Sequence, residues 1–576
     1  MRQPASRSAS SSALRSAKLP LSSRRLFLSL TLVCTTTLSL LPFSATYAAE
    51  KKPQPKLVLV LVVDGLPQEQ VQRYRDQFGQ GGFRRLLDQG AWYSDAHQAH
   101  GVTVTAVGHA AILTGAYPYQ HGIINNNWVD PNNLATVYCT QDSKHTYLGE
   151  ETKNGDGTSP ANLRVSTLGD ELRYATGNLA KVITVAGKDR SAILLAGKTG
   201  TAYMYNNRSG NFATSTYYMP RYPDWHKKYH AQRPQDRFYG KQWQPLLAEA
   251  AYSGDANDDI VAPLNLASSE RFPISFISKS GKPDAEYFEK LFTSPFLDEM
   301  TFDFARAALD GEKLGNNPQH VTDLLALSLS SHDAVNHVYG PESRMSHDHL
   351  QRLDRLLANF LNFVDQRVGL DNTLIVLTAD HGFPNTPEFS QSNKLDAQRL
   401  DGVKLMELLN KHLFEKFGVE KIARKWSPPN YFLDYAMIEK NKLKREEVEN
   451  TAARFLLNTP GVANTFTRTQ LESGAIPDNR ISKLMQRAWH RQISGDIVVV
   501  AKPYWYFSSS DHGASHGSPY KYDTNVPLML MGKPWISPGS HGEYAEVMDI
   551  APSLAHILRV RPPAASEGRV LIESMR

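Results

Sequence analysis

Carboxylate and imidazole side chains recur directly after apolar runs in this chain of 576 residues. The runs "KLVLVLVV", "LLALSLS" and "TLIVLTA" each lead into an aspartate, and a Gly- and Ser-rich loop nearer the C-terminus adds a histidine. The candidate ligands are Asp64, Asp333, His337, Asp380, His381 and His516. Oxygen and nitrogen donors with few thiolates suit zinc or a similar divalent ion. The set is large enough to hold two metals.

Each of these residues also has an ordinary structural explanation. Asp64-Gly65 after a strand is most often a turn. Asp333 and His337 are four residues apart, and most such pairs on one helix face are surface or capping pairs. Asp380-His381, after the third run, could equally cap a loop. The conjunction of all these residues in one chain is what favours a metal site.

A hydroxyl nucleophile is available in "GVTVTAVGHAAILTG", where Thr103 and Thr105 precede a helix expected to begin near Ala106. Threonine is a good helix N-cap, so capping explains Thr105 as well as catalysis does. A hydroxyl at a helix N-terminus also lies in a positive field that favours its alkoxide, and a metal strengthens that preference. Asn126 in "NNNW" could hold a phosphoryl oxygen, although a cluster of Asn residues is usually a turn.

Two cations follow a fourth apolar run, "KVITVA", in the stretch "GKDRSAI". Salt bridges at a surface loop would explain Lys188, Asp189 and Arg190. An anion clamp is the alternative, because lysine offers a compact point charge and arginine a planar fork of donors. In a clamp, we expect Asp189 to point away from the anion and to orient the turn.

The elements that must position these residues are four candidate buried strands with helical patterns between them. The strands are expected at 56–63, 181–186, 324–330 and 373–379. This alternation predicts an α/β fold with a central, mostly parallel sheet sandwiched between helices, and ligands bind beyond the carboxyl ends of such strands. Residues 205–295 and 384–510 interrupt the rhythm. We interpret them as insertions that form a cap on a single catalytic domain spanning 49–576.

Residues 1–48 have the features of a secretory signal. Six basic and no acidic residues accompany the apolar segment "LFLSLTLVCTTTLSLLPF" and the small-residue stretch "SATYAAE", which predicts cleavage after Ala48. A transmembrane anchor is the weaker alternative, because the run is short and rich in Thr and Ser. "SRRLFL" also resembles a twin-arginine export signal. The sequence therefore predicts an exported protein, periplasmic or extracellular, without a stable membrane anchor.

Removal of this segment changes the formal net charge from +5 to −1, because six basic residues leave and no acidic residue does. Nucleic acid is therefore not expected as a specific partner. Cys34 leaves with the signal, so Cys139 alone cannot form an internal disulfide. The sequence leaves the oligomeric state open.

From about Lys56 to the C-terminus, the ordered set of residues resembles the alkaline phosphatase superfamily. The matching positions are Asp64, Thr105 in "TVTAVGH", Asn126, Lys188 and Arg190 in "KDR", Asp333 and His337 in "SSHDAVNH", Asp380 and His381 in "TADHG", and His516 in "SHGSPY". The likeness is nearest to bacterial secreted alkaline phosphatases of the phosphate-irrepressible type, which use a threonine nucleophile. Cys139 lies in "CTQDS", unlike the "CxPSR" pattern of sulfatases, which argues against that branch.

The resemblance implies the zinc-dependent hydrolysis of phosphate monoesters. It implies one zinc held by Asp64, Thr105, Asp380 and His381, and a second held by Asp333, His337 and His516. It further implies Thr105 as a nucleophile that forms a phosphothreonine, with Asn126, Lys188 and Arg190 binding the substrate phosphate. No role is implied for His109, His332 or His512.

Two other functions compete with this interpretation. A phosphodiesterase or nucleotide pyrophosphatase of the same superfamily would share the metals and Thr105 but would not need Lys188 and Arg190. A non-catalytic, metal-stabilised binding protein would leave the threonine among the ligands unexplained.

Overall fold

The computed structural model describes residues 53–256, 271–510 and 512–576, all of which belong to one compact unit. The expected signal, residues 1–48, and its cleavage point lie outside the described residues. Within the described ranges, no helix combines the length and the apolar character needed to cross a bilayer.

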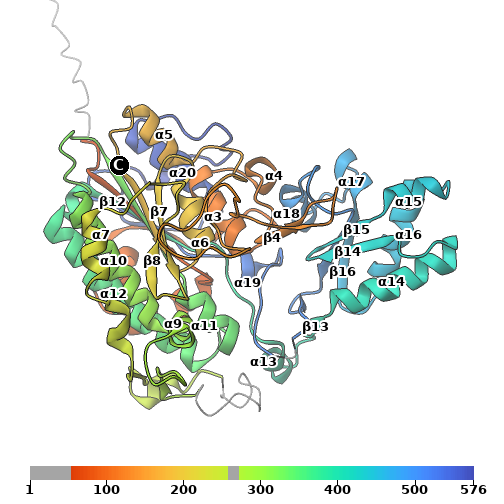
Figure 1. The fold of residues 1–576 in the computed structure, drawn as a ribbon, viewed down its shortest axis with the longest axis horizontal. Helices are drawn as coiled ribbons and strands as arrows, with labels where there is room; N and C mark the ends of the chain where they lie inside the picture. Colours follow the sequence, from red (N-terminus) through yellow and green to blue (C-terminus); the bar gives the residue numbers. More distant parts are fainter. Residues whose placement is uncertain (1–52, 257–270, 511) are drawn as a thin grey trace, which may run out of the picture. The chain divides into compact units, whose positions relative to one another are not determined.

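A nine-stranded sheet forms the centre of the fold (Figure 1). In order across the sheet, the strands are β20 (Gly539–His541), β2 (Ala91–Tyr93), β19 (Leu528–Met531), β12 (Thr373–Thr378), β1 (Leu57–Val63), β11 (Asp323–Leu329), β6 (Val182–Ala186), β7 (Thr201–Asn206) and β8 (Asn211–Ala213). The four strands expected from the sequence, β12, β1, β11 and β6, are neighbours and pair in parallel. Every residue of β1 is buried, as expected for a strand covered on both faces.

Helices cover both faces of this sheet. In Figure 1, one side carries α7 (Asp224–His230), α10 (Pro295–Glu312) and α12 (Arg344–Arg367), and the other carries α3 (Thr105–Thr114), α5 (Leu168–Ala175), α6 (Asp189–Ala196) and α20 (Ile550–Leu558). Helix α12 shows why: its Leu353, Leu357 and Phe360 are buried at helical spacing, while Arg355 and Asn359 are not. The predicted α/β fold with a mostly parallel central sheet is confirmed.

The first interruption, expected at 205–295, begins later than predicted. Residues 205–213 are part of β7 and β8, which complete one edge of the main sheet. Tyr205 and Phe212 are buried strand side chains rather than members of an irregular segment. Beyond β8 the chain forms α7, the short pair β9 (Gln242–Trp243) and β10 (Ile274–Ser275), and α9 (Ala285–Phe292).

Residues 384–510, which we call the cap, contain a second sheet that the sequence pattern did not predict. Its antiparallel strands are β14 (Ala423–Ser427), β15 (Asn430–Leu433), β17 (Ile497–Ala501) and β16 (Val462–Thr467), in that spatial order. With α14 (Gly402–Phe417) and α16 (Arg445–Leu457), this sheet encloses an apolar core of its own. Strands β14 and β16 escaped detection because three residues of each are only partly buried, so no apolar run marks them.

The cap contacts the main fold beside the ends of the central strands. The Gly101 amide donates to the Leu484 carbonyl on α18 (Arg480–Ala488) at 2.9 Å. Asn125 Nδ2 donates to the Pro428 carbonyl at 2.7 Å. Val102 also joins Met485 in one apolar cluster. The cap is therefore tied by hydrogen bonds and packing to the segments that flank Thr105.

Candidate active site

The ends of β1, β11 and β12 bring three aspartates together. Asp64 follows β1, Asp380 follows β12, and Asp333 lies in the first turn of α11 (Ser331–Tyr339) after β11. The Gly65 amide donates to Asp380 Oδ1 at 3.1 Å. Gly65 has a φ of +68°, and a Cβ there would lie 2.9 Å from the Asp333 Cβ, so only glycine suits this position. The Asp64-Gly65 turn is thus what allows the aspartates to approach one another.

The buried polar atoms of this cluster that make no hydrogen bond include Asp64 Oδ1, Asp333 Oδ1, Asp380 Oδ2 and His381 Nε2. His381 Nε2 lies 3.6 Å from Asp64 Oδ1, 3.7 Å from Asp333 Oδ1 and 3.4 Å from Asp380 Oδ2. Buried polar atoms are nearly always paired, so unpaired atoms that face one another point to a missing partner. Ligand atoms around a tetrahedral zinc are about 3.4 Å apart, which matches this spacing.

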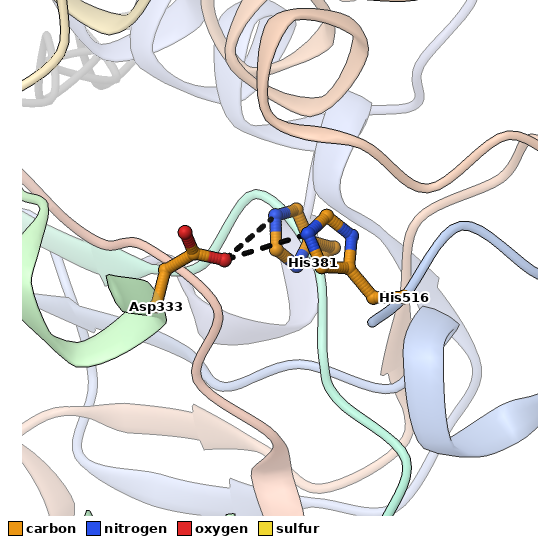
Figure 2. A group of neighbouring side chains, drawn as sticks. All are labelled: Asp333, His381 and His516. Carbon is orange, nitrogen blue, oxygen red and sulfur yellow. Dashed lines mark ion pairs between the residues drawn. The ribbon is translucent and has the colours of Figure 1, made fainter. Parts of the chain in front are cut away.

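Asp333 Oδ1 also faces two further imidazoles, at 3.4 Å from His516 Nε2 and 3.5 Å from His337 Nε2. Figure 2 shows the Asp333 carboxylate directed at both His381 and His516, whose rings stack with centroids 3.5 Å apart. Six of the seven residues expected as ligands are aspartates or histidines. All six lie together, either in contact with Asp333 or in contact with His381 beside it.

Backbone carbonyls orient the three imidazoles. The Nδ1 atoms of His337, His381 and His516 lie 2.8, 2.9 and 2.8 Å from the carbonyl oxygens of Ala514, Gly382 and Thr103. Because a carbonyl can only accept, Nδ1 carries the proton and the lone pair of Nε2 is free. This arrangement is typical of metal-binding histidines, whose second nitrogen is fixed by such a partner.

The partition into two metal groups differs from the expected one. Among the described residues, two trios have ligand atoms close enough to share an ion: Asp333, His381 and His516, and Asp64, His109 and Asp380. The resemblance placed His381 with Asp64 and Asp380 instead. Since His381 Nε2 lies within 3.7 Å of Asp64, Asp333 and Asp380 alike, it stands at the boundary between the two groups.

The charges in the cluster are unbalanced without a cation. Burial raises the pKa of Asp64 well above its ordinary value, and the neighbouring Asp380 raises it further. Burial also raises the pKa of Asp333, but Lys188 and the surrounding histidines outweigh burial and hold that pKa well below its ordinary value. Three carboxylates thus share one ammonium group, an excess of negative charge that a divalent ion would offset.

Burial lowers the pKa of His381, and it lowers the pKa of His516 well below the usual value. At His381 the carboxylates of Asp380 and Asp333 oppose the effect of burial but do not outweigh it. Both rings are therefore neutral over the ordinary pH range, which is the protonation state in which imidazole binds metals.

Thr105 is the first residue of α3, and its side chain does not cap the helix. Asn126 does so from outside the helix, because its Oδ1 accepts a hydrogen bond from the Ala106 amide at 2.8 Å. The Thr105 hydroxyl is consequently released from the capping role that competed with catalysis. Its Oγ1 lies 3.3 Å from Lys188 Nζ, at the N-terminal end of the helix.

Lys188 is buried at the centre of the cluster rather than in a surface loop. Its Nζ lies 2.9 Å from Asp64 Oδ2 and 2.5 Å from Asp333 Oδ2. Burial lowers the pKa of Lys188, but Asp333 and Asp64 raise it by more, so the amine stays charged. The surface salt-bridge interpretation of this residue is therefore wrong.

Arg190 lies in the first turn of α6, which begins at Asp189. The Asp189 carboxylate accepts hydrogen bonds from the Tyr138 hydroxyl and from the Gly157 amide. Arg190 Nη1 donates to the same hydroxyl at 3.5 Å, while its buried Nε has no hydrogen bond. Asp189 thus fixes the turn by binding the segment around residues 138–157.

His109, to which the sequence interpretation assigned no role, contacts two parts of the site. Its Nδ1 donates to the Thr105 carbonyl at 2.9 Å and lies 3.1 Å from Asp380 Oδ2, and its Nε2 lies 2.9 Å from Ser328 Oγ. It therefore connects the start of α3 with β11 and with the end of β12. The four-residue spacing from Thr105, on one face of the predicted helix, was the available signal.

A second buried histidine pair lies behind Asp333. His332 Nδ1 is 3.1 Å from His349 Nδ1, and His349 Nε2 is 3.2 Å from Asp298 Oδ2. Both rings are buried, and His332 Nε2 also lies 2.7 Å from Gln70 Oε1, outside the carboxylate cluster. His512, by contrast, is exposed and belongs to neither ligand group.

Comparison with known proteins places this geometry in a family. The sequence model of the family "Type I phosphodiesterase / nucleotide pyrophosphatase" matches residues 58–524. A protein of Myroides odoratus named calcium-transporting ATPase is 34% identical over 536 residues, covering 92% of this chain and 96% of its own. Alkaline phosphatase PafA of Elizabethkingia meningoseptica is 32% identical over 545 residues, covering 93% and 98% of the two chains.

The fold agrees with these sequence matches. The crystal structure of wild-type alkaline phosphatase PafA superimposes with a TM-score of 0.83 and 31% identity, covering 91% of this chain and 99% of that one. The family match includes all of the ligand candidates, from Asp64 to His516. The chain therefore belongs to the type I phosphodiesterase/nucleotide pyrophosphatase family of the alkaline phosphatase superfamily.

Proposed function

We propose that this protein is an exported, zinc-dependent alkaline phosphatase that hydrolyses phosphate monoesters through a phosphothreonine on Thr105. The observation that carries the proposal is the position of the Thr105 hydroxyl. It is released from helix capping by Asn126 and lies 3.3 Å from a buried ammonium group that also contacts Asp64 and Asp333. The similarity to PafA over nearly the whole chain supports the same activity.

The donor set fits zinc, because unpaired carboxylate oxygens face neutral imidazole nitrogens at the spacing of tetrahedral ligands. We assign one ion to Asp64, Thr105, Asp380 and His381, and a second to Asp333, His337 and His516. When bound, two such ions stabilise the attacking and leaving oxygens of an in-line displacement.

The side chains of the chain itself supply the remaining steps. Thr105 Oγ1 attacks phosphorus, the ester bond to the leaving alcohol breaks, and the threonine carries the phosphoryl group until water hydrolyses it. Lys188 and Arg190 hold non-bridging oxygens of the phosphate, and the Asn126 amide nitrogen donates to a third. This nitrogen makes no hydrogen bond within the described part of the chain, so it is available to substrate.

A phosphodiesterase is the second candidate, and it is supported by the description of the matching family. A diester carries one negative charge instead of two and has a substituent on a further oxygen. The buried, charged Lys188 is best used by the doubly charged monoester. A non-catalytic metal-binding protein is the third candidate. It gives no reason why Asn126 caps α3 and leaves the Thr105 hydroxyl free of that role.

One assay separates these functions. The purified protein is given p-nitrophenyl phosphate or methyl p-nitrophenyl phosphate, with and without a chelator, and its metal content is measured. We expect the monoester to have the higher kcat/KM, chelation to abolish turnover, and about two zinc ions per chain to be recovered. Preference for the diester would favour the second function, and metal without turnover of either ester would favour the third.

The proposal includes export to the periplasm or the medium, with residues 49–576 as a single catalytic domain. The predicted signal supports it, and its two adjacent arginines favour the twin-arginine route. Sequencing of the exported protein should give an N-terminus at or near Ala49. Full retention of the apolar segment in the membrane fraction would contradict this part of the proposal.

A further inference from the structure

A cavity of about 340 Å³ lies between the main fold and the cap. The main fold contributes Val104, Asn126 and His516 to its lining, and the cap contributes Pro428, Val499 and Trp505. The volume is in the range of pockets that hold small organic ligands. Neither part of the protein could form this cavity alone.

The cavity adjoins the reacting groups. Val104 directly precedes Thr105, and Asn126 holds the first turn of α3 through the Ala106 amide. His516 Nε2 faces Asp333 Oδ1 at 3.4 Å. A phosphate ester bound at Thr105 would therefore have its alcohol portion within reach of the cavity.

The lining is uncharged and largely apolar. Val102, Met485, Val499 and Ala501 supply aliphatic surface, and Trp505 and its neighbours supply aromatic surface. None of the described residues that line the cavity is an aspartate, glutamate, lysine or arginine. A leaving group that carries further phosphates or carboxylates would be desolvated there without a cationic partner among the lining residues, whereas an apolar ring would gain by burial.

Hydrogen bonds fix the cap wall of the cavity. The Pro428 carbonyl accepts from Asn125 Nδ2 at 2.7 Å, and the Pro429 carbonyl accepts from the Val499 amide at 2.9 Å. The Tyr506 hydroxyl donates to the Gly513 carbonyl at 2.7 Å, which ties this wall to the loop that carries His516. The cavity is therefore built before substrate arrives, so little ordering opposes binding.

We propose that this cavity is the leaving-group subsite, and that the preferred substrates are phosphate monoesters of uncharged alcohols that bear an apolar ring. The inference rests on the proposed function, because it assigns the alcohol portion of the same substrate. It goes further in naming the cap as the element that selects the substrate.

The test compares ethyl phosphate with 2-phenylethyl phosphate, whose leaving alcohols have similar acidity but differ by a ring. We expect kcat/KM to be at least about tenfold higher for the ring-bearing ester. The matching ethyl- and 2-phenylethylphosphonates, which cannot be hydrolysed, should show the same ratio in Kd by calorimetry. Equal values for the two esters and for the two phosphonates would overturn the inference.

Two variants locate the effect. Phe507 lines the cavity and is only partly buried, so Phe507→Ala should keep the fold and reduce the ring preference. Phe414→Ala is the matched control, because Phe414 lies in the cap on α14 with 48% of its surface exposed and is not part of the lining. An unchanged ratio in Phe507→Ala, or an equal loss in both variants, would contradict the proposal.

The outcomes separate this inference from the proposed function. If neither ester is hydrolysed, the proposed function fails, and the phosphonate affinities alone decide whether the cavity selects rings. If both esters are hydrolysed at the same kcat/KM and the phosphonates bind equally, the function stands and the cavity assignment fails.

Discussion

The edge of the central sheet and the cavity wall of the cap differ in almost every physical property. At the sheet edge, Asp64, Asp333 and His381 are buried polar groups with unpaired atoms, held by short turns at the ends of strands. The cap wall is uncharged and is built from residues such as Val499 and Trp505. The first region is suited to reaction chemistry and the second to recognition of what is attached to the reacting group.

This contrast explains how one scaffold can separate rate from selectivity. Unpaired polar atoms are unfavourable unless a bound cation or substrate satisfies them, so the sheet edge tolerates little change. An apolar wall stabilises a ligand in proportion to the area that it covers, so substitutions there alter preference gradually. Changes at the sheet edge should therefore affect all substrates, and changes at the cap wall only some.

The largest effect is expected at the sheet edge, from removal of the proposed nucleophile. Thr105→Ala should lower kcat by at least about a thousandfold for every monoester, because no second hydroxyl among the described residues hydrogen-bonds the Lys188 ammonium group. Thr105→Ser should retain part of the rate. Acid-quenched protein should carry phosphate on residue 105, and recovery of the label on another residue would disprove the assignment.

Removal of both cations should affect monoesters more strongly than diesters. In Lys188→Ala/Arg190→Ala, kcat/KM for p-nitrophenyl phosphate should fall by roughly 10²–10³-fold, and for the methyl diester by much less, because the lost contacts act on charge that the monoester carries in full. The measurement is kcat/KM for both esters. Equal losses would mean that the pair serves the structure of the site rather than the phosphate.

Loss of His109 should give an intermediate effect through the positions of Asp380 and Thr105. His109→Ala should weaken zinc binding by about 10–100-fold, as expected when the partner of a ligand is removed. Zinc competition with a chromogenic chelator measures this directly. His512→Ala is the control, since His512 is exposed and outside both ligand groups, and an equal loss in the two variants would argue against a positioning role.

The smallest effect on catalysis is expected at the joint between the two regions, where a change should act on stability instead. Glu342, after α11, accepts hydrogen bonds through Oε1 from the Thr386 amide and hydroxyl, close to where the cap leaves the main fold. Burial raises the pKa of Glu342 to about 7. The folded state therefore binds the Glu342 proton more tightly than the unfolded state does. This difference adds on the order of 3 kcal/mol to the free energy of unfolding below about pH 4.5, and the added stability is lost as the pH rises through 7.

Glu342→Gln should remove that pH dependence. The free energy of unfolding of the variant relative to wild type should increase between pH 5 and pH 8, as measured by urea denaturation of the metal-free protein. Glu543→Gln, at a carboxylate that is 70% exposed, is the control and should show no such trend. A constant difference between Glu342→Gln and wild type across this range would show that Glu342 does not titrate there.

Local patterns in the sequence predicted much of the sheet edge. Strands β1, β6, β11 and β12 were found because a strand buried on both faces is a continuous apolar run, which needs no knowledge of its neighbours. Asp64, Asp333, His337, Asp380 and His381 follow three of those runs closely in the chain, whereas His516 lies in a separate loop. Strands β14 and β16 of the cap sheet carry no such run because three residues of each are only partly buried. Strand β17, IVVVA, is a buried apolar run, but it was not recognised as a strand within a segment interpreted as an insertion.

The sequence by itself determined which residues stand at the strand ends and that three aspartates and three histidines were available there. Only the tertiary structure decided what each one contacts. Asn126 caps α3 across 20 residues, Gly65 binds Asp380 across 315, and the cavity joins Val104 to Trp505. Such contacts depend on strand order and on how closely backbones approach, and neither is expressed in the periodicity of any single segment.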